Sequence, residues 1–100
     1  MSGEKPLFIP LRRTYFEDFR TGAKMHEYRP LGARWNATTC RVGRKVTLSL
    51  GYGKHQRLHG FVSSFAVQQN PQALPGWKEC YSNRNAAAVI GITIIEYKRQ

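Results

Sequence analysis

The sequence predicts a single α+β domain built on a small mixed β-barrel, with one or two short helices. Three observations lead to this fold class: short strand-like runs follow one another, one stretch spaces aromatic residues as in a helix, and the joins are rich in turn-forming residues. One hundred residues suffice for one domain, residues 1–100, with one modest core. No repeat, linker or low-complexity segment divides the chain.

The first predicted elements are a strand and a helix. Leu7 to Leu11 is mostly apolar, and Pro10 favours an edge position or a strand end because proline donates no ladder hydrogen bond. Thr14 to Thr21 is predicted to be helical, and Thr14 with Glu17 matches a capping box. The apolar face of this helix, which we expect in the core, consists of Tyr15, Phe16 and Phe19.

A hairpin is predicted in the middle of the chain. Lys45 to Leu50 alternates apolar and polar residues, as a half-buried strand does. Gly51 to Gln56 suits the turn, and Leu58 to Val67 the return strand. Gly60 predicts a bulge, or a close approach of ligand or backbone. The residues expected to share one face of the return strand are His59, Phe61, Ser63 and Phe65.

Two long connections and a closing strand complete the chain. Leu31 to Arg44 is predicted to be a loop that Trp35 anchors. Gln68 to Asn85 is a polar loop in which Trp77 to Tyr81 suits one helical turn, and loops of this length in small domains are often functional. The last strand is expected over Ala86 to Lys98. Its apolar face carries Ile90, Ile92 and Ile94.

The composition points to an anionic partner. Sixteen Lys and Arg residues against six Asp and Glu give a formal net charge of +10, which favours RNA, DNA or a nucleotide over a membrane surface. Cys40 and Cys80 are the only cysteines, and no secretory signal or membrane span is visible, so we expect a cytoplasmic monomer with reduced thiols. The three histidines do not form a metal set. No cofactor is predicted, and a divalent metal such as Mn²⁺ would enter only in a nuclease.

A cluster of charges follows the predicted helix. Gly22 suits a left-handed helix end. Lys24, Glu27 and Arg29 then fall within six residues at the start of a second predicted strand. In a regular strand Glu27 and Arg29 share a face, so Lys24 joins them only from the preceding turn or across a bulge. One interpretation is a binding or proton-transferring site. The other is a Glu27–Arg29 pair that only fixes the strand.

These four residues, spaced as Gly-x-Lys-x-x-Glu-x-Arg after a short N-terminal helix, resemble the signature of the ASCH domain. That domain belongs to the PUA-like group of small β-barrels. The resemblance covers most of the chain, from the first strand and helix through a glycine-rich hairpin to the closing strand. It implies a PUA-like barrel with a ligand cleft at the signature strand, and a role in binding RNA or a nucleotide.

The resemblance also implies a possible enzyme. Some ASCH members are ribonucleases, and others are amidohydrolases that remove the acyl group from acetylcytidine. The deacylating members use a Lys, a Thr three residues on and a distant Glu. Lys24 matches that Lys, but Glu27 stands at the Thr position, and Glu79 is a candidate for the distant carboxylate. For a ribonuclease, the nearby His26 would be a further suitable group. Lys24 and Glu27 are therefore the catalytic candidates if the protein is a hydrolase.

The ligand candidates combine cations with aromatic rings, which suits the phosphates and stacked bases of single-stranded nucleic acid. We expect their cleft between Lys24 to Arg29, the Gly51–Gln56 hairpin and the Gln68–Asn85 loop. Trp35 and Trp77 have a second interpretation as core lids. A further hypothesis is a basic regulator that binds an acidic protein. The predicted ligand-binding residues are Arg12, Arg13, Tyr28, Arg29, Arg34, Trp35, Arg44, Tyr52, Lys54 and Trp77.

Overall fold

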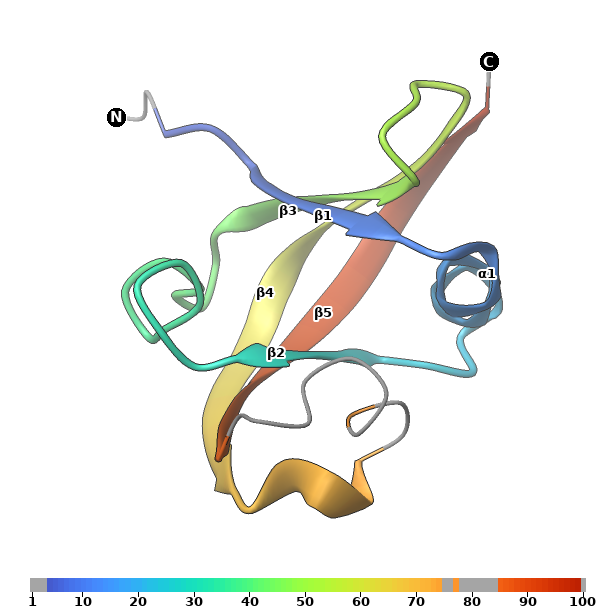
Figure 1. Cartoon of the computed structure of the whole chain (residues 1–100). Helices are drawn as coiled ribbons and strands as arrows, with labels where there is room; N and C mark the ends of the chain where they lie inside the picture. Colours follow the sequence, from blue (N-terminus) through green and yellow to red (C-terminus); the bar gives the residue numbers. More distant parts are fainter. Residues whose placement is uncertain (1–3, 75–76, 78–84, 100) are drawn as a thin grey trace.

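A curled, mixed five-stranded sheet forms a half-barrel, with one α-helix beside it, in the computed structural model, which describes residues 4–74, 77 and 85–99 (Figure 1). The strand order is β1-β3-β4-β5-β2, and only β1 and β3 run parallel. This is a small barrel-like α+β fold. The elements are β1 (Leu7–Leu11), α1 (Arg13–Thr21), β2 (His26–Pro30), β3 (Lys45–Leu50), β4 (Gln56–Gln69), the 3-10 helix η1 (Pro71–Ala73) and β5 (Ala86–Arg99).

Strand β1 lies at one edge of the sheet, as the proline predicted. It pairs with β3 on one side only, with Leu7 opposite Val46, so the missing N–H of Pro10 interrupts no central ladder. Alternate residues of the strand are buried, which turns Ile9 into the core and leaves Pro10 partly exposed. The other edge is β2, which pairs only with β5.

Helix α1 begins one residue earlier than expected and lacks the predicted capping box. Its N-cap is Arg12, which makes no side-chain capping bond. Thr14 therefore lies inside the first turn, and Glu17 instead accepts a hydrogen bond from Arg20 Nε at 2.5 Å. The prediction of the helix end is confirmed, because Gly22 has a φ of +86°, a left-handed conformation that glycine adopts without a steric penalty.

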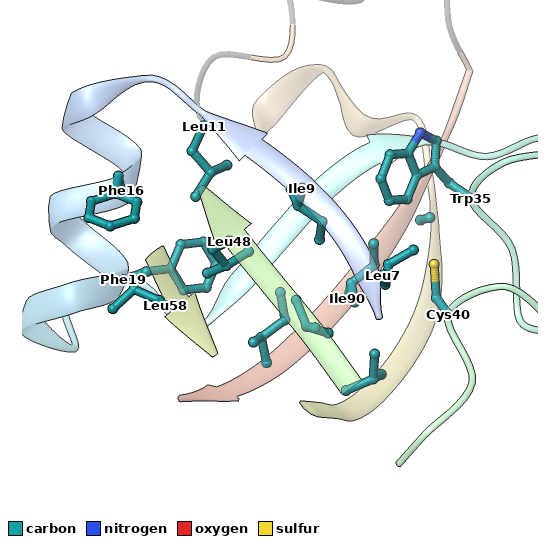
Figure 2. Close-up of a cluster of buried hydrophobic side chains, with 14 residues drawn as sticks. Leu7, Ile9, Leu11, Phe16, Phe19, Trp35, Cys40, Leu48, Leu58 and Ile90 are labelled. Carbon is teal, nitrogen blue, oxygen red and sulfur yellow. The ribbon is translucent and has the colours of Figure 1, made fainter. Parts of the chain in front are cut away.

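The core fills the space between the sheet and α1 (Figure 2). Phe16 and Phe19 enter it from the helix, as their spacing predicted, and Tyr15 packs against it. Trp35 and Cys40, from the loop between β2 and β3, lie toward the other end. The buried cluster consists of Leu7, Ile9, Leu11, Phe16, Phe19, Trp35, Cys40, Val46, Leu48, Leu58, Val62, Ala88, Ile90 and Ile92.

Strand β3 is buried more completely than its alternating pattern predicted. Thr47 and Ser49, expected on a solvated face, are both buried. The Thr47 hydroxyl lies 3.4 Å from Nδ1 of His59 on β4. The Ser49 hydroxyl donates to the Gly53 carbonyl at 3.0 Å, across the hairpin. Their hydroxyls therefore find protein partners, which lowers the cost of taking them out of water.

The long strands β4 and β5 form the centre of the sheet. Their register shifts between His59 and Gly60, which confirms the bulge predicted at this glycine. A Cβ at position 60 would meet the Thr93 backbone, with the carbonyl carbon only 2.9 Å away. A second shift after Val62 reverses the faces, so Phe61 is exposed while Phe65 packs against the core. The expectation that the two rings share a face was therefore wrong.

The connection after β4 is shorter than predicted, because β4 continues to Gln69 and η1 follows at Pro71. Trp77 is buried, with 1% of its surface exposed. Apart from Trp77, the helical turn expected from Trp77 to Tyr81 lies outside the described residues, and so do Glu79 and Cys80. In β5, Ile90 and Ile92 face the core as predicted, and Ile94 packs against it. No helix in the described part of the chain has the length and apolar character needed to span a membrane.

Candidate functional site

The signature segment runs from the end of α1 into β2. Strand β2 begins only at His26, so Lys24 is in the turn before the strand, the first of the two placements that would let it join Glu27 and Arg29. Two backbone hydrogen bonds hold this turn. The Lys24 N–H donates to the Asp18 carbonyl at 3.0 Å, and the Ile92 N–H donates to the Met25 carbonyl at 2.9 Å. The turn is thereby tied both to the helix and to β5.

The Lys24 ammonium lies among aromatic rings. Its Nζ is 4.6 Å from the ring centroid of Tyr28, 5.3 Å from that of Tyr15 and 5.8 Å from that of Phe19. Within the described residues it has no hydrogen bond or ion pair, and the three rings provide cation–π attraction. Burial lowers the pKa of Lys24 below the ordinary value of 10.5, and the charges of Glu27 and Asp18 oppose that shift.

A surface hollow of about 400 Å³ opens beside this ammonium. We call it the Lys24 hollow. It offers a half-buried cation that suits a phosphate, two phenol rings that suit a flat base, an imidazole, and the Asp18 carboxylate, which accepts hydrogen bonds and would face a phosphate unfavourably. Its lining residues are Tyr15, Asp18, Ala23, Lys24, Met25, His26 and Tyr28.

Glu27 and Arg29 form an internal pair. Arg29 Nε donates to Glu27 Oε2 at 2.7 Å, and only 8% of the glutamate side chain and 18% of the arginine side chain are exposed. Arg29 Nη2 also donates to the Pro10 carbonyl at 3.0 Å, and its guanidinium carbon lies 5.0 Å from the Trp35 ring centroid. The Arg29 guanidinium is thus already hydrogen-bonded within the protein through Nε and Nη2, which favours the interpretation that the Glu27–Arg29 pair only fixes the strand.

The other predicted ligand residues fall into separate places. Tyr52 in the hairpin is 82% exposed, and its ring lies 6.3 Å from that of Phe8. The Gly51 N–H donates to the Leu11 carbonyl at 2.9 Å, which brings the hairpin beside the start of α1. We call this the hairpin surface. The predicted cations and ring on it, all exposed, are Arg12, Arg13, Tyr52 and Lys54.

The remaining candidates are mostly engaged in the fold. Trp35 is 7% exposed and Trp77 1% exposed, so both are buried, as expected for side chains that cover the core. The exposed Arg34 lies with its guanidinium carbon 5.1 Å from the Trp35 centroid. Arg44 donates from Nη1 to the Thr39 carbonyl at 2.6 Å and from Nη2 to the Lys5 carbonyl at 3.0 Å.

The described residues do not bring the three expected walls of the cleft together. The Lys24 hollow is bounded by α1 and the turn, whereas the Gly51–Gln56 hairpin lies at the other edge of the sheet, beside β1 (Figure 1). Much of the third wall, in the Gln68–Asn85 loop, is outside the described residues. Tyr15 also lines the Lys24 hollow, although the sequence analysis assigned it only to the core. Its position at the edge of the apolar face of the helix could have indicated that its ring is partly accessible.

Comparison with known proteins identifies no relative: no protein-family model, no curated protein and no solved structure matches this chain. The likeness to the ASCH domain therefore rests on the four signature residues and the order of elements. Across the residues that the structure describes, no three His, Cys, Asp or Glu side chains gather as metal ligands.

Proposed function

We propose that the protein is an ASCH-like domain of the PUA-like group that binds RNA or a nucleotide at the Lys24 hollow. The observation that carries the proposal is the Lys24 ammonium, half-buried beside two tyrosine rings and without an anionic contact in the described structure. Removing a cation from water is costly unless a charge partner compensates it. A bound phosphate would supply that partner, and Tyr28 or Tyr15 would offer a ring to the base.

The distribution of charge supports a polyanionic ligand. The net charge of +10 favours association with nucleic acid, and the hairpin surface adds exposed cations and an exposed ring. Tyr52 and Lys54 could contact nucleotides beyond the one in the hollow. Arg29 has a different role in this proposal. It holds β2 and the buried Glu27 in place, and the signature thereby presents Lys24 at the surface.

The proposal is tested by the affinity for a short single-stranded RNA of wild type, Lys24→Gln and Lys98→Gln. Both variants remove one positive charge, but Lys98 is exposed on β5 and lines a different hollow. We expect Lys24→Gln to weaken binding and to reduce its salt dependence by about one phosphate contact. Equal losses in the two variants would leave only a general charge effect and reject the Lys24 hollow.

A hydrolase is the second candidate, and one observation favours it. Burial lowers the pKa of Lys24, which increases the fraction of neutral amine that could accept a proton from water or from the 2′-hydroxyl of RNA. Glu27 is close enough to influence that pKa but is engaged by Arg29, so its own role would be electrostatic. The Thr-like hydroxyl of the deacylating ASCH members is absent at this position.

The two candidates separate in one assay. Pure protein is incubated with the short RNA, with and without Mn²⁺, and with acetylcytidine, beside Lys24→Gln and Glu27→Gln. Product formed by wild type but not by Lys24→Gln would identify an enzyme with its site at the hollow. Intact RNA that binds with strong salt dependence would identify a binding module. Melting temperatures of the variants distinguish a lost site from a lost fold, which matters most for the buried Glu27.

A further inference from the structure

A second basic hollow, of about 660 Å³, lies between the segment before β1 and the loop that leads into β3. This loop lies across the sheet from α1 and from the turn that carries Lys24 (Figure 1). Four cationic side chains and one carboxylate line the hollow, which gives it a formal net charge of +3. We call it the Arg41 hollow. Its lining residues are Glu4, Lys5, Thr38, Arg41, Gly43, Arg44 and Lys45.

Arg44 gives this hollow a fixed frame. Its Nη1 donates to the Thr39 carbonyl at 2.6 Å, and its Nη2 donates to the Lys5 carbonyl at 3.0 Å. One guanidinium therefore ties the N-terminal segment to the loop. Its side chain is only 16% exposed; the bond to Thr39 is partly buried, and the bond to Lys5 lies at the exposed surface. The Arg44 side chain thereby links the two backbone walls of the hollow.

The hollow already holds an anionic group from the chain itself. Glu4 Oε1 lies 2.6 Å from Arg41 Nη2, and Glu4 Oε2 lies 3.6 Å from Arg44 Nε. The side chains of Glu4 and Arg41 are 42% and 54% exposed. An exposed pair of this kind is worth no more than about a fivefold change in an equilibrium. A phosphate, which carries more acceptor oxygens than a carboxylate, can therefore displace Glu4.

We propose that the Arg41 hollow binds a backbone phosphate of RNA, and that Glu4 occupies the same position in the free protein as a competitor. Arg41, with a largely exposed side chain, is the partner that exchanges Glu4 for phosphate. Lys5 and Lys45, both exposed, add charge at the rim. The choice of RNA rests on the proposed function, but the site itself rests on the Glu4 contact and on the frame that Arg44 builds.

The test measures the affinity of the full chain for a fluorescent oligouridylate over a series of salt concentrations. The proteins are wild type, Glu4→Gln, Arg41→Gln and the double variant. Glu17→Gln is the matched control, because it also removes one acidic charge beside an arginine, Arg20 on α1. We expect Glu4→Gln to bind about twofold to fivefold more tightly. We expect Arg41→Gln to lower the salt slope by about one and to abolish the gain from Glu4→Gln.

Several outcomes would overturn the proposal. They are no gain in Glu4→Gln, an equal gain in Glu17→Gln, a gain that persists without Arg41, or no measurable binding by wild type and Glu4→Gln. Lys24→Gln, measured in parallel, reports on the proposed function separately. If Lys24→Gln binds like wild type while the Glu4 and Arg41 effects remain, the Lys24 hollow is rejected and the Arg41 hollow is supported.

Discussion

Arg29 on β2 donates a hydrogen bond from Nη2 to the Pro10 carbonyl on β1 at 3.0 Å. These strands are the two edges of the sheet, so one side chain joins the ends of the half-barrel. The same guanidinium donates from Nε to the buried Glu27 at 2.7 Å. Two charges of the signature, Glu27 and Arg29, are therefore engaged within the sheet, whereas the neighbouring Lys24 lines the hollow.

Removing Arg29 should destabilise the protein strongly. Arg29→Ala would leave Glu27 as a buried carboxylate without its partner, a change that costs about 3–5 kcal/mol. Denaturant unfolding followed by circular dichroism gives the free energy of unfolding. The control is Arg29→Met with Glu27→Leu, which removes both charges and should recover much of the loss. A single variant as stable as wild type would show that the pair does not hold the half-barrel.

Gly60 should tolerate no side chain. A Cβ there would collide with the Thr93 carbonyl group, which is backbone in the central β4–β5 ladder, so Gly60→Ala should cost about 3 kcal/mol or more in unfolding free energy. Gly91→Ala is the matched comparison, because its nearest contacts belong to the side chains of Ser64 and Ser63. Thermal unfolding should therefore show a much smaller loss for Gly91→Ala. Similar losses of stability in the two variants would mean that the destabilisation comes from replacing a glycine in a strand and not from the collision with Thr93.

Local patterns predicted the elements well because each depends on neighbouring residues. The missing N–H of Pro10, the aromatic spacing of α1 and the missing side chain of Gly60 are all properties that can be read from the residue itself or from its close neighbours in sequence. The apolar–polar pattern failed where contacts with residues distant in sequence determine which side chains are buried. Ser49 is buried by the hairpin, and the second β4–β5 shift, after Val62, separates Phe61 from Phe65.

The candidate site divides in the same way. The spacing of the signature singled out Lys24, and the structure places it beside a hollow. Pairing of Arg29 with a carbonyl nineteen residues away cannot be inferred from spacing, because it depends on how the sheet curls. The contact between Glu4 and Arg41 joins residues that are even farther apart in sequence. Charge composition predicted an anionic ligand but carries no information on which cations are already engaged.

Tyr52 should contribute to RNA affinity without contributing to stability. Its ring is largely exposed, so a base stacked on it would add roughly 1–3 kcal/mol to binding. Tyr52→Ala should weaken binding of the short RNA accordingly in a fluorescence titration, with little change in melting temperature. Phe61→Ala removes an exposed ring from β4 and serves as control. Equal affinities of Tyr52→Ala and wild type would remove the hairpin surface from the binding site.

Lys24 should make the stability of the protein depend on alkaline pH. Burial lowers its pKa in the folded state, so at pH values between that lowered pKa and the ordinary 10.5 the unfolded state binds more protons than the folded state. The free energy of unfolding contributed by this residue therefore rises with pH across that window, and the penalty for burying the charge is gone above it. The informative quantity is the difference between wild type and Lys24→Gln, because the ionisation of groups that both proteins share contributes to both curves.

That difference is measured by urea unfolding of both proteins at a series of alkaline pH values. We expect wild type to gain stability relative to Lys24→Gln as the pH rises. A constant difference would mean that Lys24 is hydrated in the folded protein. A difference that falls with pH would mean that Glu27 and Asp18 stabilise the ammonium by more than burial penalises it. In either case the cation would already be satisfied without a ligand, and the argument for a phosphate in the Lys24 hollow would lose its physical basis.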